Sequence, residues 1–506
     1  MFKIEIEESP ISIEVSMEKQ KIEQDHKASF KKIHYSLILF LFIEVFFYLL
    51  FSEPVTALLN NGNPLLPLPP DTVISRAARL VMIYHSLAVP FLVANTFWIM
   101  EYYPVREKWI PALKVLLIPG AFLVGINGLI FGYTRWRFFH ELFYFGLFLV
   151  LLGGIVFIIS AMPIPGKFPD PETNPSGLTL WGLNLEYFSI IILAVCIIVS
   201  TVMGALAALE NFTGTIWGLG RPPEAFLPEA IIRVTHHDTV EAYIVSHLHI
   251  QLAQSTAMVL LVGYRTSKIS GKIYKGVLLA NPIGIITISY GAWVLNHYVI
   301  WVGAGILILC TIAMAAVGMI NTSKDVMGEK YESASRFEKL KGLFRDPVKF
   351  TYYFLFLFGQ VIVTITGISV GLRVDEVYRL HDNIFIEYSF NVGHWHVLSV
   401  LIATILMLKA IDFFEVHGLK RTIIGWLFFI GSVIAFTGAN LYMLRLPNAD
   451  TQLTLFITFT GVWFLLAGYI GGLYFISKQI LQERNERKSA EMLLLGEPLV
   501  QERLNI

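Results

Sequence analysis

Two histidines with one residue between them, His394 and His396, lie at the start of a long apolar run in the segment FNVGHWHVLSV, residues 390–400. Imidazole is costly to bury in a membrane unless a partner binds it. On an α-helix each residue turns by about 100°, so these two side chains point about 200° apart and cannot bind the same group. The spacing therefore indicates a separate ligand on each of two opposite faces of one helix.

Most of the other histidines gather at one level of the predicted membrane spans. Ten of the thirteen lie at or near the ends of spans that we predict to face outward: His85, His140, His236, His237, His247, His249, His297, His381, His394 and His396. A lone membrane histidine commonly hydrogen-bonds a neighbouring helix. A cluster contributed by several helices at similar depth favours metal or haem ligation, or a proton path.

Membrane helices must position these side chains. The chain has 506 residues, of which 55% are hydrophobic and 15% charged, and its mean hydropathy is +0.63. This composition is typical of a polytopic membrane protein. Apolar windows of about 20 residues predict an all-α bundle of twelve spans, near 34–52, 77–100, 111–132, 138–162, 184–209, 238–263, 276–296, 298–320, 350–371, 390–411, 422–443 and 453–478.

Basic residues concentrate in alternate loops and so predict the orientation. The stretches 265–275 and 321–349 are strongly basic, as are the loop with Lys420 and Arg421 and the C-terminal tail. With twelve spans these segments share one side with both termini, which predicts that side to be cytoplasmic in a multi-pass protein of the plasma (inner) membrane.

The predicted organisation is a cytoplasmic segment over 1–33, one membrane domain over 34–478 and a cytoplasmic tail over 479–506. The formal net charge of zero argues against a nucleic-acid partner. Cys196 and Cys310 lie in the middle of apolar runs, and we interpret them as buried small residues.

The chain resembles the large catalytic subunit of the haem-copper oxidase superfamily, and is nearer the nitric oxide reductases and dismutases than the oxygen reductases. The segment VGHWHVLS is similar to the His-x-His of that family's tenth helix. The resemblance implies that His394 binds a high-spin haem and His396 a low-spin haem. It also implies that His85, in RLVMIYHSLAVPF, is the second axial ligand of the low-spin haem.

The family's second metal uses one histidine on the sixth helix and a His-His pair just past the seventh. By resemblance the matching residues are His247 in VSHLHIQLAQS and His297 in AWVLNHYVIWVG, with Asn296 replacing the first histidine of the pair. Gln251 follows His247 by one turn, where oxidases carry a tyrosine and nitric oxide reductases a glutamate. His237 is an alternative to His247 as the sixth-helix ligand.

Two further matches concern the haem propionates. His381 and Asp382 resemble the family's His-Asp pair ahead of the tenth helix, and Arg445 resembles its propionate-binding arginine before the last helix. A guanidinium group suits a carboxylate partner.

The resemblance implies a respiratory-chain oxidoreductase with two b-type haems and one non-haem iron or copper. Nitric oxide is the expected substrate, by reduction or disproportionation, because Gln251 cannot supply the phenolic hydrogen atom used by oxidases. Electrons would come from cytochrome c, a cupredoxin or quinol, or through a small companion subunit. An oxygen-reducing terminal oxidase, an electron-transfer cytochrome without the second metal, and a polytopic transporter remain alternatives.

The sequence shows no evident polar route for protons from the cytoplasm. The span 298–320 has no lysine, and 238–263 has no glutamate near its centre. Because protons need ionisable side chains or ordered water to cross hydrocarbon, we expect turnover to draw protons from the outer side and not to pump them.

Overall fold

The protein is an all-α membrane protein. In a computed structural model, the residues described are 30–44, 73–134, 136–164, 167–169, 179–211, 239–294, 296–372, 397–444 and 450–494. The predicted site residues outside these described residues are His237, His381, Asp382, His394, His396 and Arg445. Residues 1–29 of the predicted N-terminal segment and 495–506 of the predicted tail also lie outside them.

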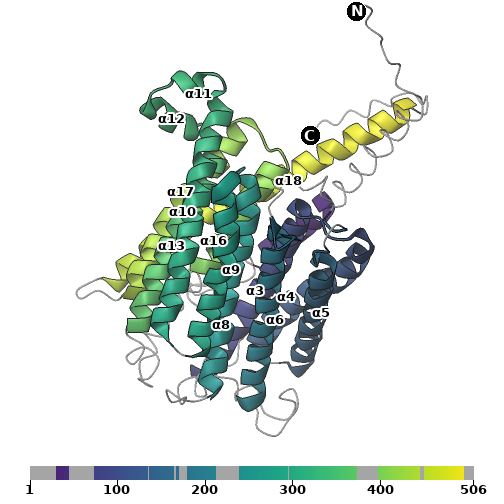
Figure 1. Cartoon of the computed structure of the whole chain (residues 1–506), viewed down its shortest axis with the longest axis vertical. Coiled ribbons are helices and arrows are strands. Elements are labelled where there is room, and N and C mark those ends of the chain that lie inside the picture. The colour runs from purple at the N-terminus through teal and green to yellow at the C-terminus, as the bar shows by residue number, and fades with distance from the viewer. Residues whose placement is uncertain are drawn as a thin grey trace, which may run out of the picture.

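Long helices make up almost all of the described chain (Figure 1). A first helix covers residues 30–44. The later elements are α3 (Val73–Tyr102), η1 (Glu107–Trp109), α4 (Ile110–Thr134), α5 (Arg137–Ala161), β1 (Thr179–Leu180), β2 (Leu183–Asn184), α6 (Leu185–Asn211), α8 (Thr239–Thr266), α9 (Gly271–Trp293), α10 (His297–Met327), α11 (Lys330–Ser333), α12 (Arg336–Leu343), α13 (Pro347–Leu372), α16 (Val397–Phe413), α17 (Gly418–Leu444) and α18 (Thr451–Leu494).

Eight of the described helical segments are long and apolar enough to cross a membrane. They are Glu107–Thr134, Arg137–Ala161, Leu185–Ala205, Gly271–Trp293, His297–Met327, Pro347–Ser369, Gly418–Met443 and Gln452–Glu486. Every one of the twelve apolar windows predicted from sequence contains helix in the described part of the chain. Several helices continue past their apolar window, most of all α10 and α18.

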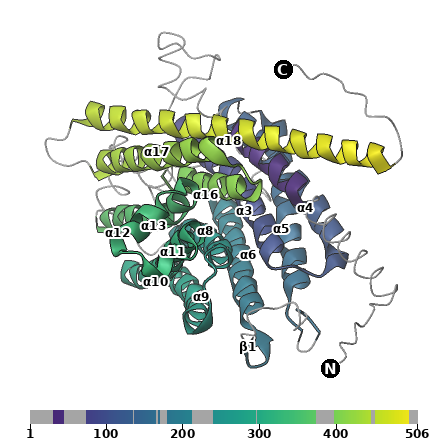
Figure 2. The same cartoon turned by 90° about the horizontal axis from the view of Figure 1, so that it is seen from above.

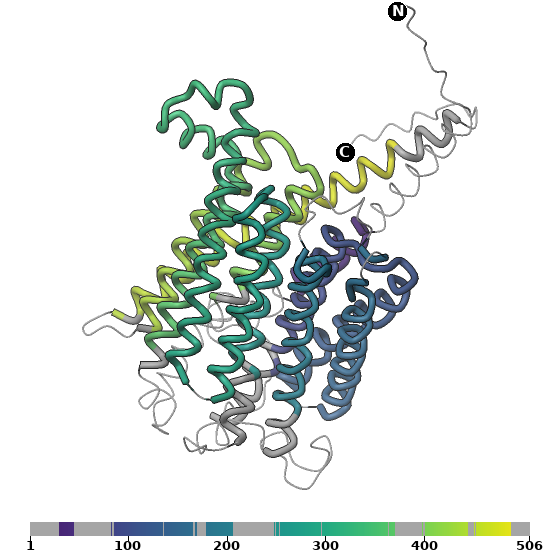
Figure 3. The backbone as a smooth tube through the Cα atoms, viewed as in Figure 1, coloured from purple at the N-terminus to yellow at the C-terminus, as the bar shows by residue number. Residues whose placement is uncertain are grey.

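The helices form one bundle with α8 at its centre. Helices α3 to α6 lie on one side and α9, α10, α13 and α17 on the other, as the backbone trace shows (Figure 3). Helix α8 contacts α3, α6, α9, α10 and α16. Seen from above, α18 runs along the whole width of one side, next to α17 (Figure 2).

Consecutive helices approach closely at glycines. A Cβ built at Gly146 of α5 would lie 2.8 Å from the backbone nitrogen of Val124 on α4, and one at Gly303 of α10 would lie 2.7 Å from the carbonyl oxygen of Gly284 on α9. Small residues at crossings let helix backbones pack without a hydrophobic driving force between them in lipid. These glycines therefore set the spacing of the pairs α4–α5 and α9–α10.

Charged side chains join the helices at one end of the bundle. The Arg421 guanidinium binds both carboxylate oxygens of Asp346, at 3.1 and 2.9 Å, and also donates to Asp412 at 2.8 Å. Lys268 pairs with Asp325 at 2.9 Å. The basic loops predicted to share one side of the membrane thus meet at one end of the structure.

Candidate functional site

The site centres on two histidines from different helices, His85 of α3 and His247 of α8. Their ring centroids are 5.7 Å apart and their ring planes differ by 14°. Both side chains are mostly enclosed, and Phe143 of α5 lies edge-on to His85 with a centroid distance of 6.0 Å. Two of the histidines singled out in the sequence are therefore brought together inside the bundle.

Helix α6 fixes the orientation of His247. Its Nδ1 is 2.8 Å from the carbonyl oxygen of Ser200, and the Ser200 hydroxyl donates to the His247 carbonyl at 3.0 Å. Because a carbonyl can only accept, Nδ1 carries the proton and Nε2 presents a lone pair. Metal-binding histidines commonly donate their second ring N–H to a backbone carbonyl in this way.

Gly204, one turn beyond Ser200 on α6, makes room for the His247 ring. A Cβ built at Gly204 would lie 2.6 Å from Nδ1 and 2.7 Å from Cε1 of His247. The imidazole thus packs directly on the helix backbone. Its position is determined by a hydrogen bond on one side and by close contact on another.

The two rings lie close together with nearly parallel planes. The sequence-based assignment gives His85 to a low-spin haem and His247 to a second metal, and it stays a prediction. The donor chemistry of the pair fits either haem iron or a non-haem ion, since both accept neutral imidazole.

The other predicted ligands of the second metal lie on α8 and at the start of α10. Gln251 is half-buried one turn past His247, and its backbone carbonyl accepts the Ser255 hydroxyl at 3.0 Å. His297 is the half-buried first residue of α10. Within the described residues, no three or more His, Cys, Asp or Glu side chains come together in a group that could hold a metal ion.

Asn296 caps the start of α10, a structural role that was not predicted from the sequence. It is exposed, and its side-chain oxygen accepts from the backbone N–H groups of Tyr298 and Val299 at 3.1 and 3.3 Å. Asparagine is a preferred N-cap because it satisfies N–H groups that have no partner in the first turn. Asn296 therefore begins α10, and its amide oxygen is already engaged.

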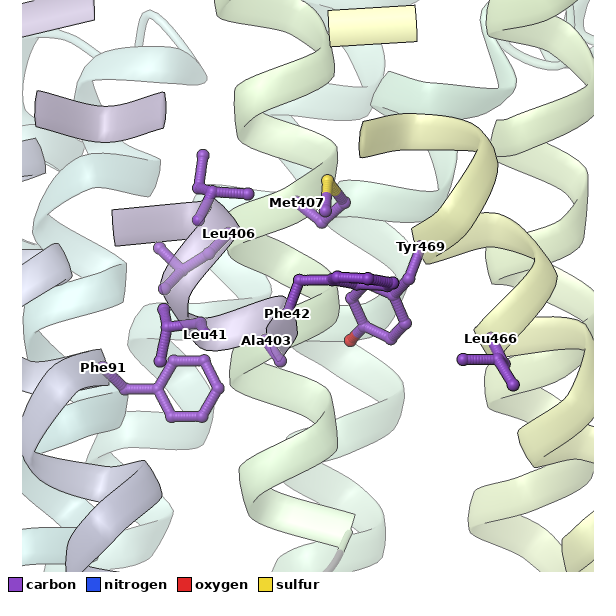
Figure 4. A pocket seen from close by; sticks show the side chains of 9 residues that line it. Leu41, Phe42, Phe91, Ala403, Leu406, Met407, Leu466 and Tyr469 are labelled. Carbon is purple, nitrogen blue, oxygen red and sulfur yellow. The ribbon is translucent and has the colours of Figure 1, made fainter. Parts of the chain in front are cut away.

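A small cavity lies elsewhere in the bundle, between residues 30–44, α3, α16 and α18. It measures about 30 Å³ and is lined by apolar side chains such as Phe91 and Met407 (Figure 4). The hydroxyl of Tyr469, which also lines it, bonds with that of Thr404 at 2.8 Å. A space of this size holds about one water molecule, so it is not a cofactor site.

Sequence reasoning missed Glu44. This glutamate lies in LFLFIEVFFYLL, residues 39–50, and is 2% exposed in the first helix. A single acidic residue near the middle of a predicted span is a visible signal, because such residues are expensive in a membrane. The prediction that no polar route crosses the membrane rests on the sixth and eighth spans, whereas this carboxyl group lies in the first.

Neither a known protein-family model nor a curated protein matches this chain.

Proposed function

We propose that the protein is a twelve-span membrane oxidoreductase of the haem-copper oxidase type that acts on nitric oxide. The observation that carries the proposal is the His85–His247 pair, in which the Nδ1–H of His247 bonds with the Ser200 carbonyl and leaves Nε2 available. Neutral imidazoles held this way inside a helical bundle suit ligation of a redox metal.

The orientation is part of the same proposal. Lys268, in the loop after α8, and Arg421, in the first turn of α17, pair with acidic residues at one end of the bundle. Lys31, just before the first predicted span, joins the same end by pairing with Glu483 of α18 at 2.9 Å. By the positive-inside rule we take this end as the cytoplasmic one, with both termini in the cytoplasm and the protein in the plasma (inner) membrane.

The haem ligands are those that the resemblance implies. His85 and His396 hold the low-spin haem, His394 the high-spin haem, and His381, Asp382 and Arg445 contact the propionates. A haem with two histidine ligands transfers electrons, and one with a single histidine leaves a position where substrate binds.

His247 and His297 hold a non-haem iron or copper, with Gln251, one turn past His247, as a further ligand. The residues around His247 keep one tautomer and one ring orientation. The reaction is reduction of nitric oxide with electrons from cytochrome c, a cupredoxin, quinol or a companion subunit, or disproportionation without net electrons.

One observation favours a second candidate function. The amide oxygen of Asn296 caps α10, and without it the second metal loses a ligand that the resemblance assigned. An electron-transfer cytochrome that binds haem but no second metal would have this arrangement.

Pyridine haemochrome spectra of the purified chain, with iron and copper analysis, test the proposal. We expect two haems per chain and consumption of nitric oxide. In His85→Ala the six-coordinate low-spin spectrum should disappear while a high-spin component remains. His249→Ala is the matched control, because His249 points about 200° away from His247 on α8. A chain without haem refutes the proposal, and haem without a second metal or gas consumption supports the electron-transfer cytochrome.

A further inference from the structure

Glu44 places a carboxyl group inside the membrane-spanning part of the bundle. It is 2% exposed, and neither of its carboxyl oxygens has a hydrogen-bond partner within the described residues. Counting from His34 at the start of the predicted span, Glu44 lies about 15 Å along the helix. This depth is about half the hydrocarbon thickness, so lipid headgroups do not reach it.

Helix α4 provides a recess for this carboxyl group. A Cβ built at Gly125 would collide with Oε1 of Glu44 and with the end of the Phe40 ring. Phe40 also packs on Phe122, one turn earlier on α4, with ring centroids 4.1 Å apart. The side chain is therefore confined between an aromatic pair and a bare stretch of helix backbone.

Among the described residues, the helices around Glu44 offer it no counter-charge. On α4 the titratable side chains are Lys114 and Tyr133, which lie about 16 Å and 12 Å from Gly125 along the helix axis. On its own described helix, the nearest titratable residues are Tyr35 and His34, nine and ten residues before it. On α3 the titratable residue nearest to this level is His85. An ionised carboxylate without a partner is costly in an apolar interior, whereas a protonated one is neutral. The ligand that satisfies Glu44 is a proton.

The glycine recess continues along α4 toward the histidine pair. Gly128 follows Gly125 by one turn, about 4.5 Å along the helix, and a Cβ built there would collide with the hydroxyl of Ser86. Ser86 is buried, donates to the Met82 carbonyl at 2.7 Å and directly follows His85 on α3. A carboxyl group, a hydroxyl group and the His85–His247 pair thus lie in succession along α4 and α3.

We propose that Glu44 is a proton-storage site in the membrane that supplies protons to the His85–His247 site by way of Ser86. The transfer step rests on the proposed function. Reduction of two nitric oxide molecules to nitrous oxide and water consumes two protons and two electrons, and the electron donor of that function (cytochrome c, a cupredoxin, quinol or a companion subunit) supplies the electrons. The O–H bond of the Glu44 carboxylic acid breaks, its proton joins the oxygen released as water, and the carboxylate is reprotonated from an aqueous side.

Infrared spectroscopy of the purified full-length protein tests whether Glu44 carries a proton. At neutral pH we expect a carboxylic-acid C=O band that shifts in D2O and is lost in Glu44→Gln. Glu141→Gln is the matched control, since Glu141 is exposed and paired with Arg137 at 3.0 Å. The control should keep the band. If the band is absent from the wild type, or persists in Glu44→Gln, the inference is wrong.

Two further measurements test the inference even if a variant folds poorly. A hydrophobic carbodiimide should label Glu44 of the wild-type protein but not Glu141, as read by mass spectrometry of its peptides. Glu44→Gln should leave the unfolding temperature unchanged, because glutamine replaces a neutral acid of the same shape. Labelling of Glu141 instead, or a large loss of stability, indicates an ionised and paired Glu44 and overturns the inference.

The rate of nitric oxide consumption tests the proton-transfer step separately. In haem-loaded Glu44→Gln we expect at least a tenfold slower consumption of nitric oxide with unchanged haem content, and a changed pH profile. An unchanged rate and profile refutes the transfer step. Because the infrared band needs no haem, a protein without haem that shows the band refutes the proposed function and leaves the proton site standing.

Discussion

Replacing Gly204 with alanine tests whether the α6 backbone holds His247 in one orientation. The new Cβ would lie 2.6 Å from Nδ1 of His247, whereas ordinary contact begins at 3.4 Å. The ring must therefore retreat by about 0.8 Å, and its 2.8 Å hydrogen bond to the Ser200 carbonyl then stretches beyond the useful range. Overpacking and loss of a buried hydrogen bond each cost about 1–3 kcal/mol.

Because one shift of the ring causes both effects, we expect the free energy of unfolding to fall by about 2–3 kcal/mol in total. If His247 binds a metal, its affinity should also fall by about 10–100-fold, as when other groups that orient a ligand are changed. The measurements are the unfolding temperature in detergent and the metal and haem content after titration.

Gly305→Ala is the matched control for this variant. Gly305 lies inside a span on α10, and a Cβ built there meets nothing within 4 Å. Alanine in a helix is favoured over glycine by up to about 1 kcal/mol, so the control should be neutral or slightly stabilised. If Gly204→Ala is as stable as Gly305→Ala and binds metal equally well, the reasoning about His247 is refuted.

Three other predictions concern the charged end of the bundle and the helix packing. Arg421→Gln should destabilise the protein by about 1–3 kcal/mol, because two carboxylates lose their shared partner; an unchanged thermal unfolding curve would contradict this. Glu338 accepts hydrogen bonds from the backbone N–H and hydroxyl of Ser335, which hold the pKa of its carboxyl group below the ordinary value of 4.5. Helix α12 should therefore keep its amide protection against hydrogen exchange at neutral pH and lose it as the pH falls below 4.5. The same acid sensitivity in Glu338→Gln would rule out this cause. Gly461→Ala should separate α18 from α17, because the new Cβ would collide with the Ala435 backbone. We expect the free energy of unfolding to fall by about 1–3 kcal/mol, and stability equal to that of Gly305→Ala would show that the helices adjust freely.

The helical architecture was predictable because hydropathy reports burial in lipid directly. The apolar windows at 111–132 and 422–443 coincide with α4 and α17 to within a few residues, except that α17 begins earlier. The windows missed the ends of α10 and α18, since the polar residues that extend these helices into water carry no apolar signal.

The His85–His247 contact was not predictable from sequence. Depth along a helix follows from residue counting, but the rotation of one helix against another depends on packing details such as the space at Gly204. The capping role of Asn296 was open to prediction, because asparagine directly before a helix is a known start signal. The family resemblance predicted a metal-binding role for this residue instead. The roles of His394 and His396 stay predictions.

The length of α18 has a practical consequence for imaging. Its 44 residues extend about 66 Å, whereas the hydrocarbon core is about 30 Å thick, so much of the helix projects beyond the lipid. Tyr35 fixes it to the first helix through Ser477 at 3.0 Å, and the Lys31–Glu483 pair does so further along. A soluble domain could be fused to the α18 extension in helical register, and it would then point in the direction of the last span. Such a domain would give electron microscopy a rigid marker for aligning particles that otherwise carry little mass outside the membrane.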